Sequence, residues 1–296
     1  MDAKATLKLS VAVAVATIAL KTGAWWVTGS VSLLSDAIES LVNLAGAMFA
    51  LTMVTVAALP PDADHPYGHH KAEYFSSGFE GILIIAAAAA ILWTAGHRLV
   101  DPQPIEAAGI GLALALLSSA LNAGLALTMR RKARELRSMA LEGDARHLMV
   151  DVWTSVGVVV GLLAVSFTGW LWLDPLIAMA LALNILREGV SLMRQSADGL
   201  MDRALEPELR DEIERTLEVF RHQAIRFDHV VTRRAGARRF VDLHMHMPAG
   251  WTLGRAAALR TSVEQALMSA VPGLRATIQL LPMDVEAHFD DPKDLL

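Results

Sequence analysis

Six apolar stretches, each about long enough to cross the hydrocarbon core of a bilayer, occupy most of the chain before residue 202. They are Leu7–Val27, Leu33–Leu59, Phe75–His97, Ile105–Met129, Arg146–Thr168 and Leu173–Met193. A segment in lipid must satisfy its own backbone polar groups, so each stretch is expected to be an α-helix. The 296 residues are 54% hydrophobic and only 19% charged. This composition indicates a multi-pass membrane protein with a soluble part.

The first stretch resembles a secretory signal sequence, because Lys4 and Lys8 precede it. Its length and the lack of an obvious small-residue cleavage site favour a transmembrane helix instead. Basic residues gather on one side of the expected spans, as Lys4, Lys8, Lys71, Arg130, Arg131, Lys132, Arg134, Arg137 and Arg146. The positive-inside rule then predicts that both termini are cytoplasmic. The net charge of -5 gives no indication of a nucleic-acid partner.

The chain becomes polar near Asp202, which predicts a transmembrane domain over residues 1–202 and a cytoplasmic domain over residues 203–296. Amphipathic and alternating segments follow one another in the order helix, strand, strand, helix, strand. They are Pro207–Phe220, Phe227–Thr232, Arg239–Met247, Leu253–Val271 and Ala276–Leu281. The expected fold is therefore six transmembrane helices followed by a small α+β domain of ferredoxin-like, αββαβ order.

Candidate metal ligands lie within two of the apolar stretches. His147 and Asp151 are separated by one helical turn and therefore share a face. Asp36, Glu39 and Asn43 form a similar stripe on the second stretch. Ionisable groups inside a membrane are expensive and usually functional, so the two stripes predict one divalent-metal site. The structural alternatives are that His147 only caps a helix and that Asp36 only forms a hydrogen bond to a neighbouring helix.

Other polar residues carry weaker signals. The chain has no cysteine, so a metal has to be held by histidine, carboxylate, amide or backbone groups. The segment Asp62–Lys71 places Asp62, His65 and His69 in one short turn, either as a second metal site or as an ordinary polar loop. His222, His229 and His288 are expected at the surface. Glu80 in the third stretch receives no role from the sequence.

These features together resemble the cation diffusion facilitator family of divalent-metal/proton antiporters. The most specific local matches are His65–Glu73, which reads HPYGHHKAE, and Leu33–Ala37, which reads LLSDA. The resemblance implies a homodimer in a membrane, with the bacterial inner membrane expected. It implies that Zn²⁺, or Fe²⁺, Mn²⁺, Co²⁺ or Cd²⁺, is the substrate and a possible structural ion, and that no organic cofactor is needed.

The resemblance also assigns residues. It implies that His147 and Asp151 are transport-site ligands, completed by Glu39 and Asn43, where relatives more often have Asp/Asp or His/Asp pairs. Asp36 matches a family acidic position and would restore the lost charge, as a ligand or through a hydrogen bond to one. The resemblance further implies a loop site at Asp62, His65 and His69. Lys71 and Asp202 match a charge pair that ties the membrane domains of a homodimer together.

The cytoplasmic domain departs most from the family pattern. Asp228 and His244 match ligands of a two-metal cluster, but the other matching positions are Ala257, Gln279 and Leu281. A full binuclear site is therefore not expected. His244 and His246, with Asp228, are expected to hold at most one weaker ion.

Three classes of function follow. The first is proton-coupled export of a divalent metal by alternating access, because protons and metal compete for the same histidine and carboxylate groups. The second, a membrane metalloenzyme, is disfavoured because neither a His-Glu-x-x-His pair nor an activated nucleophile is present. The third is a metal-responsive membrane scaffold or receptor, which would bind metal without transporting it.

Overall fold

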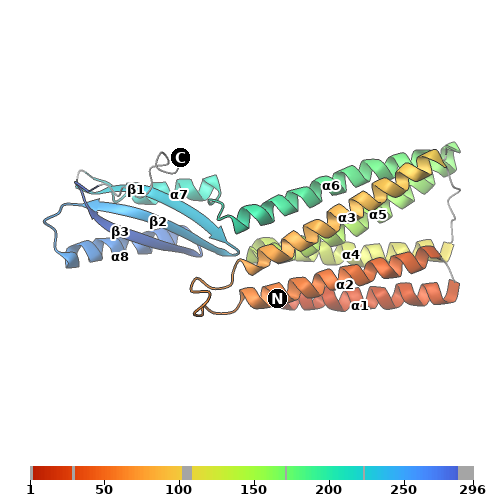
Figure 1. Ribbon diagram of the computed structural model, residues 1–296, viewed down its shortest axis with the longest axis horizontal. Coiled ribbons are helices and arrows are strands. Elements are labelled where there is room, and N and C mark those ends of the chain that lie inside the picture. Colours follow the sequence, from red (N-terminus) through yellow and green to blue (C-terminus); the bar gives the residue numbers. More distant parts are fainter. Residues whose placement is uncertain (1–2, 29–30, 102–108, 171, 223, 286–296) are drawn as a thin grey trace. The chain divides into compact units, whose positions relative to one another are not determined.

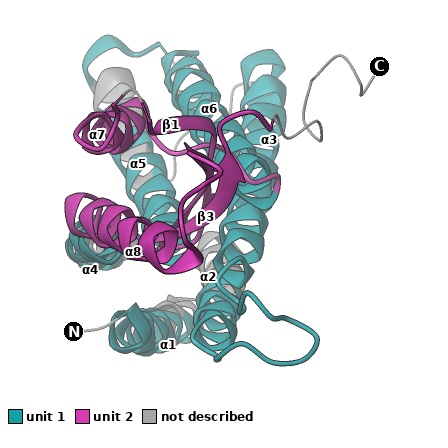
Figure 2. Cartoon of the chain, turned by 90° about the vertical axis from the view of Figure 1, so that its left-hand side faces the viewer, with its two compact units in different colours: residues 1–200 teal, residues 201–296 magenta. Residues whose placement is uncertain are grey.

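The computed structural model describes residues 3–28, 31–101, 109–170, 172–222 and 224–285. Within its helices, some side chains lie outside the description: those of residues 20–21, 24–25, 27–28, 31–40, 42–43, 109–115, 155, 158–159, 161–166 and 174. The chain divides into two compact units, residues 1–200 and 201–296 (Figure 2). Each unit is described by itself.

Unit 1 consists, over its described residues, of six long helices (Figure 1). They are α1 (Ala3–Thr28), α2 (Val31–Ala57), α3 (Ala72–Val100), α4 (Gly109–Leu136), α5 (Met139–Thr168) and α6 (Leu173–Leu200). Among the described residues, Ala72–Val100 and Pro175–Leu200 are long and apolar enough to cross a membrane, and Leu44–Ala57 is a shorter apolar segment. That all six helices cross a membrane stays a prediction.

Several helices extend beyond the apolar stretches that predicted them. The expected span ending at Met129 continues through the basic run to Leu136, and α5 begins at Met139 rather than near Arg146. Likewise, α6 continues to Leu200. Hydropathy detects only the part of a helix that suits hydrocarbon, whereas Arg, Lys, Glu and Gln are good helix formers outside it. At the start of α5, the Ser138 hydroxyl accepts the Leu141 N–H at 3.4 Å as a helix cap.

Helix α5 is the centre of unit 1, since it packs against α1, α2, α3, α4 and α6. The other extensive pairings are α1 with α2, α4 with α5, and α3 with α6. Glycines permit the close approach of α3 and α6. A Cβ on Gly81 would come within 3.2 Å of the Met193 backbone nitrogen, and one on Gly199 within 2.3 Å of Tyr74 Cε1.

Unit 2 contains a three-stranded sheet with two helices. Its elements are α7 (Pro207–Glu218), β1 (Arg226–Ala235), β2 (Arg238–Met247), α8 (Leu253–Ala270) and β3 (Leu274–Pro282). The strand order is β1-β2-β3, with β1 antiparallel and β3 parallel to β2. The observed order of elements is the expected αββαβ.

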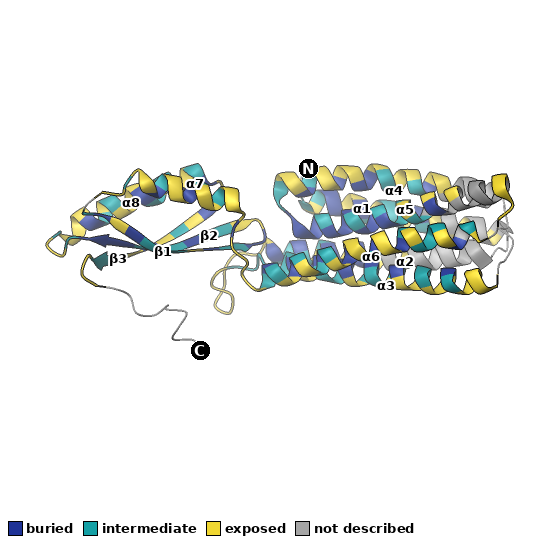
Figure 3. Ribbon diagram, turned by 90° about the horizontal axis from the view of Figure 1, so that it is seen from above, coloured by how far each residue is buried: buried dark blue, intermediate teal, exposed yellow. Residues whose placement is uncertain are grey.

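The core of unit 2 lies between the sheet and its helices, which lie on one side of it (Figure 3). Successive residues of a strand point to opposite faces. Val241, Leu243 and Met245 of β2 are buried in this core, together with Leu217 of α7 and Val263 of α8. The alternate β2 positions, which include His244 and His246, therefore belong to the other face of the sheet.

Candidate metal-binding sites

Helix α5 places His147 and Asp151 inside unit 1. His147 is buried, with 6% exposure, and Asp151 is half-buried. From α4, the Asn122 amide donates a hydrogen bond to Asp151 Oδ2 at 3.4 Å. This bond joins α4 to α5. A carboxylate and an imidazole one turn apart on the central helix can offer oxygen and nitrogen ligands to one ion.

The second expected stripe belongs to α2, whose helix contacts α5. The side chains of Asp36, Glu39 and Asn43 lie outside what the structure describes. Their part in the transport site stays a prediction.

Glu80 of α3, to which the sequence assigns no role, lies beside His147. Its carboxylate is buried, with 1% exposure, and Oε2 lies 3.2 Å from His147 Nδ1. The available signal was a carboxylate within a membrane-length apolar stretch, which is rare and usually functional. Without a ligand-type neighbour one turn away, Glu80 had no pattern that linked it to His147.

Asp144 is a second buried carboxylate near His147, three residues earlier on α5 and 2% exposed. It forms a hydrogen bond with the Ser10 side chain of α1. The described part of this region therefore brings together His147, Asp151, Asp144 and Glu80. Burying several carboxylates close together costs free energy unless some of them bind protons or share a cation.

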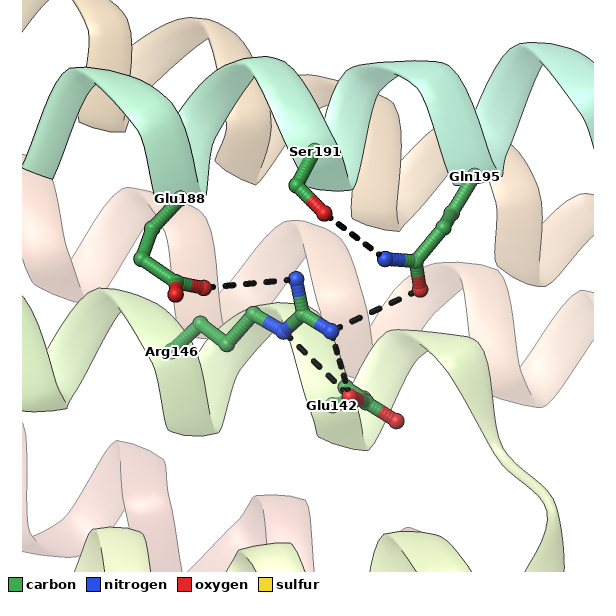
Figure 4. Close-up of polar contacts among 5 residues, drawn as sticks. All are labelled: Glu142, Arg146, Glu188, Ser191 and Gln195. Carbon is green, nitrogen blue, oxygen red and sulfur yellow. Dashed lines mark hydrogen bonds and ion pairs between the residues drawn. The ribbon is translucent and has the colours of Figure 1, made fainter. Parts of the chain in front are cut away.

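Arg146 is next to His147 in sequence, but its side chain contacts α6 and not α3 (Figure 4). Its Nη2 donates to Glu142 Oε1 at 2.7 Å, and Nη1 lies 3.6 Å from Glu188 Oε2. Gln195 accepts from Nη2 at 3.5 Å and donates to Ser191 Oγ at 3.0 Å. The guanidinium is thus balanced by two carboxylates at the α5–α6 contact, whereas His147 faces α3.

The loop between α2 and α3 holds the second candidate site. Asp62 Oδ1 lies 3.4 Å from His65 Nδ1, and Oδ2 lies 3.4 Å from His69 Nε2. One ligand atom from each residue can be chosen so that all three lie within 4.8 Å of one another. Ligands of one tetrahedral zinc ion stand about 3.3–3.6 Å apart, given bonds of about 2.0–2.2 Å. The structure brings the three residues together, and metal binding by them stays a prediction.

Local backbone geometry organises this loop. Asp62 Oδ1 accepts the backbone N–H groups of His65 at 2.7 Å and Asp64 at 3.1 Å, as in an Asx turn. The His65 N–H is the main cause that lowers the pKa of Asp62 from its ordinary value, and the imidazoles of His69 and His65 add to it. The carboxylate therefore stays ionised at neutral pH. Its stabilising contribution is lost only as the pH falls through the lowered pKa.

Asp62→Asn tests the loop site. Asparagine keeps an oxygen for the His65 N–H but removes the negative charge, so we expect metal affinity of the loop to fall about tenfold or more. The measurement is metal titration of the purified full-length protein by calorimetry. Asp64→Asn is the matched control, because it removes the same charge from the same loop outside the cluster. Equal affinities for the two variants would contradict a metal site at Asp62.

The third candidate site lies on the face of the unit 2 sheet opposite its helices. Asp228 of β1 is paired in register with His244 of β2. Asp228 Oδ1 lies 3.2 Å from His244 Nδ1, and Oδ2 lies 2.9 Å from His246 Nε2. The three residues offer ligand atoms within 4.8 Å of one another. His229, expected only at the surface, stacks on His244 with ring centroids 4.8 Å apart.

His246 lies between two oxygen acceptors. Its Nδ1 lies 3.2 Å from the Pro282 carbonyl oxygen, and its Nε2 lies 2.9 Å from Asp228 Oδ2. Each ring nitrogen therefore has an oxygen neighbour that can accept a hydrogen bond. The geometry suits one bound ion, and its binding stays a prediction.

Lys71 and Asp202 belong to different units. Lys71 Nζ donates to the Leu200 carbonyl at 3.1 Å, and Asp202 Oδ1 accepts from Arg233 Nη1 at 3.3 Å. Their pairing across a dimer stays a prediction.

Comparison with known proteins identifies two domains of one family in the chain. Residues 7–201 match the family model of the cation efflux transmembrane domain, and residues 205–283 match that of the cation efflux protein cytoplasmic domain. The uncharacterized transporter sll1263 of Synechocystis is 43% identical over 97% of this chain and 92% of its own. The cation-efflux pump FieF of Klebsiella pneumoniae is 32% identical over 93% of this chain and 91% of its own.

Two solved structures of CzrB are also similar. One is 35% identical and covers 26% of this chain and 96% of its own, with a TM-score of 0.25. The other, its Zn form, is 32% identical and covers 29% of this chain and 99% of its own, with a TM-score of 0.27. The two family models together span nearly the whole chain. The chain therefore belongs to the cation diffusion facilitator family and is a membrane protein of cation efflux.

Proposed function

We propose that the protein exports a divalent transition-metal ion from the cytoplasm in exchange for protons. The transport site consists of Glu39 and Asn43 of α2 with His147 and Asp151 of α5, and Asp36 assists it. The observation that supports this proposal best is the burial of His147 and the position of Asp151 on α5, the helix that contacts all five others. Movements of the surrounding helices can expose a ligand pair on the central helix first to one side of the membrane and then to the other.

The chemistry of the ligands accounts for proton coupling. Imidazole and carboxylate groups must be deprotonated to bind a metal, so metal binding releases protons and protons release metal. Zn²⁺ suits four such nitrogen and oxygen ligands, whereas Fe²⁺, Mn²⁺, Co²⁺ and Cd²⁺ are competitors for the same set. Zn²⁺ is the substrate that we favour. Proton binding on the outer side and metal binding on the cytoplasmic side then drive export.

The remaining features belong to the same proposal. Six helices cross the bacterial inner membrane with both termini in the cytoplasm, and two chains form a homodimer. Residues 203–296 form a cytoplasmic domain that supports dimerisation and regulation. The Asp62 loop and the Asp228 cluster each hold one ion as structural or regulatory sites. A metal-responsive scaffold or receptor is the competing function, and it predicts metal binding without flux.

The two unusual α2 ligands provide a test of metal selection. Glu39→Asp with Asn43→Asp restores the commoner ligand pair, so we expect relative flux among Zn²⁺, Mn²⁺, Fe²⁺, Co²⁺ and Cd²⁺ to change about tenfold for at least one pair of metals. Flux is measured in proteoliposomes that contain metal-sensitive dyes. An unchanged metal profile would place these two residues outside the site, and binding without flux in the wild type would support the scaffold.

A further inference from the structure

We propose that Glu80 of α3 is an additional ligand of the transported cation. This inference rests on the proposed function, because it concerns the same ion and includes His147. It goes further by assigning a ligand to a third helix, whereas the two stripes recognised in the sequence belong to α2 and α5.

The first argument is the state of the Glu80 carboxylate. Glu80 is 1% exposed, and neither Oε1 nor Oε2 has a hydrogen-bond partner among the described residues. A buried carboxylate without donors or a cation carries a large desolvation penalty. By contrast, the other glutamate of α3, the half-buried Glu73, accepts from Ser138 Oγ at 2.6 Å and from the Ala140 N–H at 3.4 Å. Glu73 has a structural partner, and Glu80 lacks a comparable one.

The second argument is the contact with His147. Oε2 of Glu80 and Nδ1 of His147 are 3.2 Å apart, yet the pair does not have hydrogen-bond geometry. Two ligands bonded at about 2.0–2.2 Å to one ion, at a tetrahedral or slightly smaller angle, are separated by about 3.1–3.6 Å. The observed separation therefore suits two donors that share a cation.

The third argument is the space that is kept for the carboxylate. A Cβ on Gly46 of α2 would come within 2.7 Å of Glu80 Oε1, and one on Gly143 of α5 within 3.3 Å of Glu80 Cγ. Gly46 lies three residues after Asn43, and Gly143 lies one turn before His147. Glycines on both of the expected ligand helices thus let the α3 carboxylate approach their backbones. The carboxylate also supplies the negative charge that Asn43 lacks.

The assignment is tested with Co²⁺ as a spectroscopic probe of the full-length, detergent-purified protein. Co²⁺ absorption reports the number and type of ligands, and the difference between wild type and Glu80→Gln isolates the site that depends on Glu80. We expect Glu80→Gln to change the visible spectrum and to weaken Zn²⁺ affinity, measured by chelator competition, about ten- to a hundredfold. Glu73→Gln makes the same change to the half-buried glutamate of α3 and should leave both readouts as in the wild type.

Unchanged spectrum and affinity in Glu80→Gln would overturn the assignment. If this variant does not fold, Glu80→Asp keeps the charge with a shorter reach, and we then expect weakened affinity with an altered spectrum; wild-type values would overturn the assignment equally. His147→Ala separates the two proposals. Loss of binding in His147→Ala with normal binding in Glu80→Gln rejects only the Glu80 ligand, whereas undiminished flux in His147→Ala rejects the transport site itself.

Discussion

Asp151→Ala should abolish metal export while leaving the protein folded. The substitution removes the carboxylate of the proposed ligand pair on the central helix α5, so we expect flux to fall about a hundredfold or more. It also removes the acceptor of the Asn122 amide, which would cost about 1–3 kcal/mol in the free energy of unfolding if that amide stays buried without a partner. Metal uptake by proteoliposomes measures the first effect, and thermal unfolding in detergent measures the second.

Two further variants make this result specific. Asp151→Asn keeps the size of the side chain and an oxygen for the Asn122 amide, so it should lose flux with a smaller change in stability. Glu188→Gln changes a carboxylate that is ion-paired with Arg146 at the α5–α6 contact, and it should retain flux. Wild-type flux in Asp151→Ala would show that Asp151 does not bind the transported ion.

Gly199→Ala should destabilise unit 1 by disturbing the contact between α3 and α6. A Cβ at this position would lie 2.3–2.7 Å from Cε1, Cζ and Cδ1 of the Tyr74 ring, which is fully buried. A ring held on all sides cannot move aside cheaply, and overpacking of this kind costs about 1–3 kcal/mol. We expect a lower midpoint of thermal unfolding for the detergent-purified protein.

Gly96→Ala is the matched control for this prediction. A Cβ on Gly96 of α3 would meet nothing within 4 Å, and alanine is the better helix former by about 1 kcal/mol. Its unfolding midpoint should equal or exceed that of the wild type. If Gly199→Ala unfolded at the wild-type temperature, the tight approach of Tyr74 to α6 would be contradicted.

The sequence predicts helices well where hydropathy alone determines them. The apolar stretch Phe75–His97 lies within α3, because hydrocarbon demands both apolar side chains and a hydrogen-bonded helix. The ends of the helices are harder to predict from the sequence. The span expected to end at Met129 continues through the basic run to Leu136, because the residues of that run favour helix.

The candidate sites show a similar division. His147 and Asp151 are recognisable because one helix turn joins them, and Asp62, His65 and His69 because one short loop holds them. Glu80 depends on the packing of α3 against α5, and no spacing in the sequence reports that packing. His246 was identified as a candidate, but the role of its Nδ1 depends on the Pro282 carbonyl, which only the β2–β3 pairing brings near.

The most direct test of metal export in exchange for protons is simultaneous recording of metal and pH in proteoliposomes. With a proton gradient imposed across the membrane, the wild-type protein should move Zn²⁺ in one direction while dissipating the gradient. Asp151→Ala should do neither. Zn²⁺ movement that leaves the pH gradient intact, or equal movement through Asp151→Ala, would contradict a shared site for protons and metal on α5.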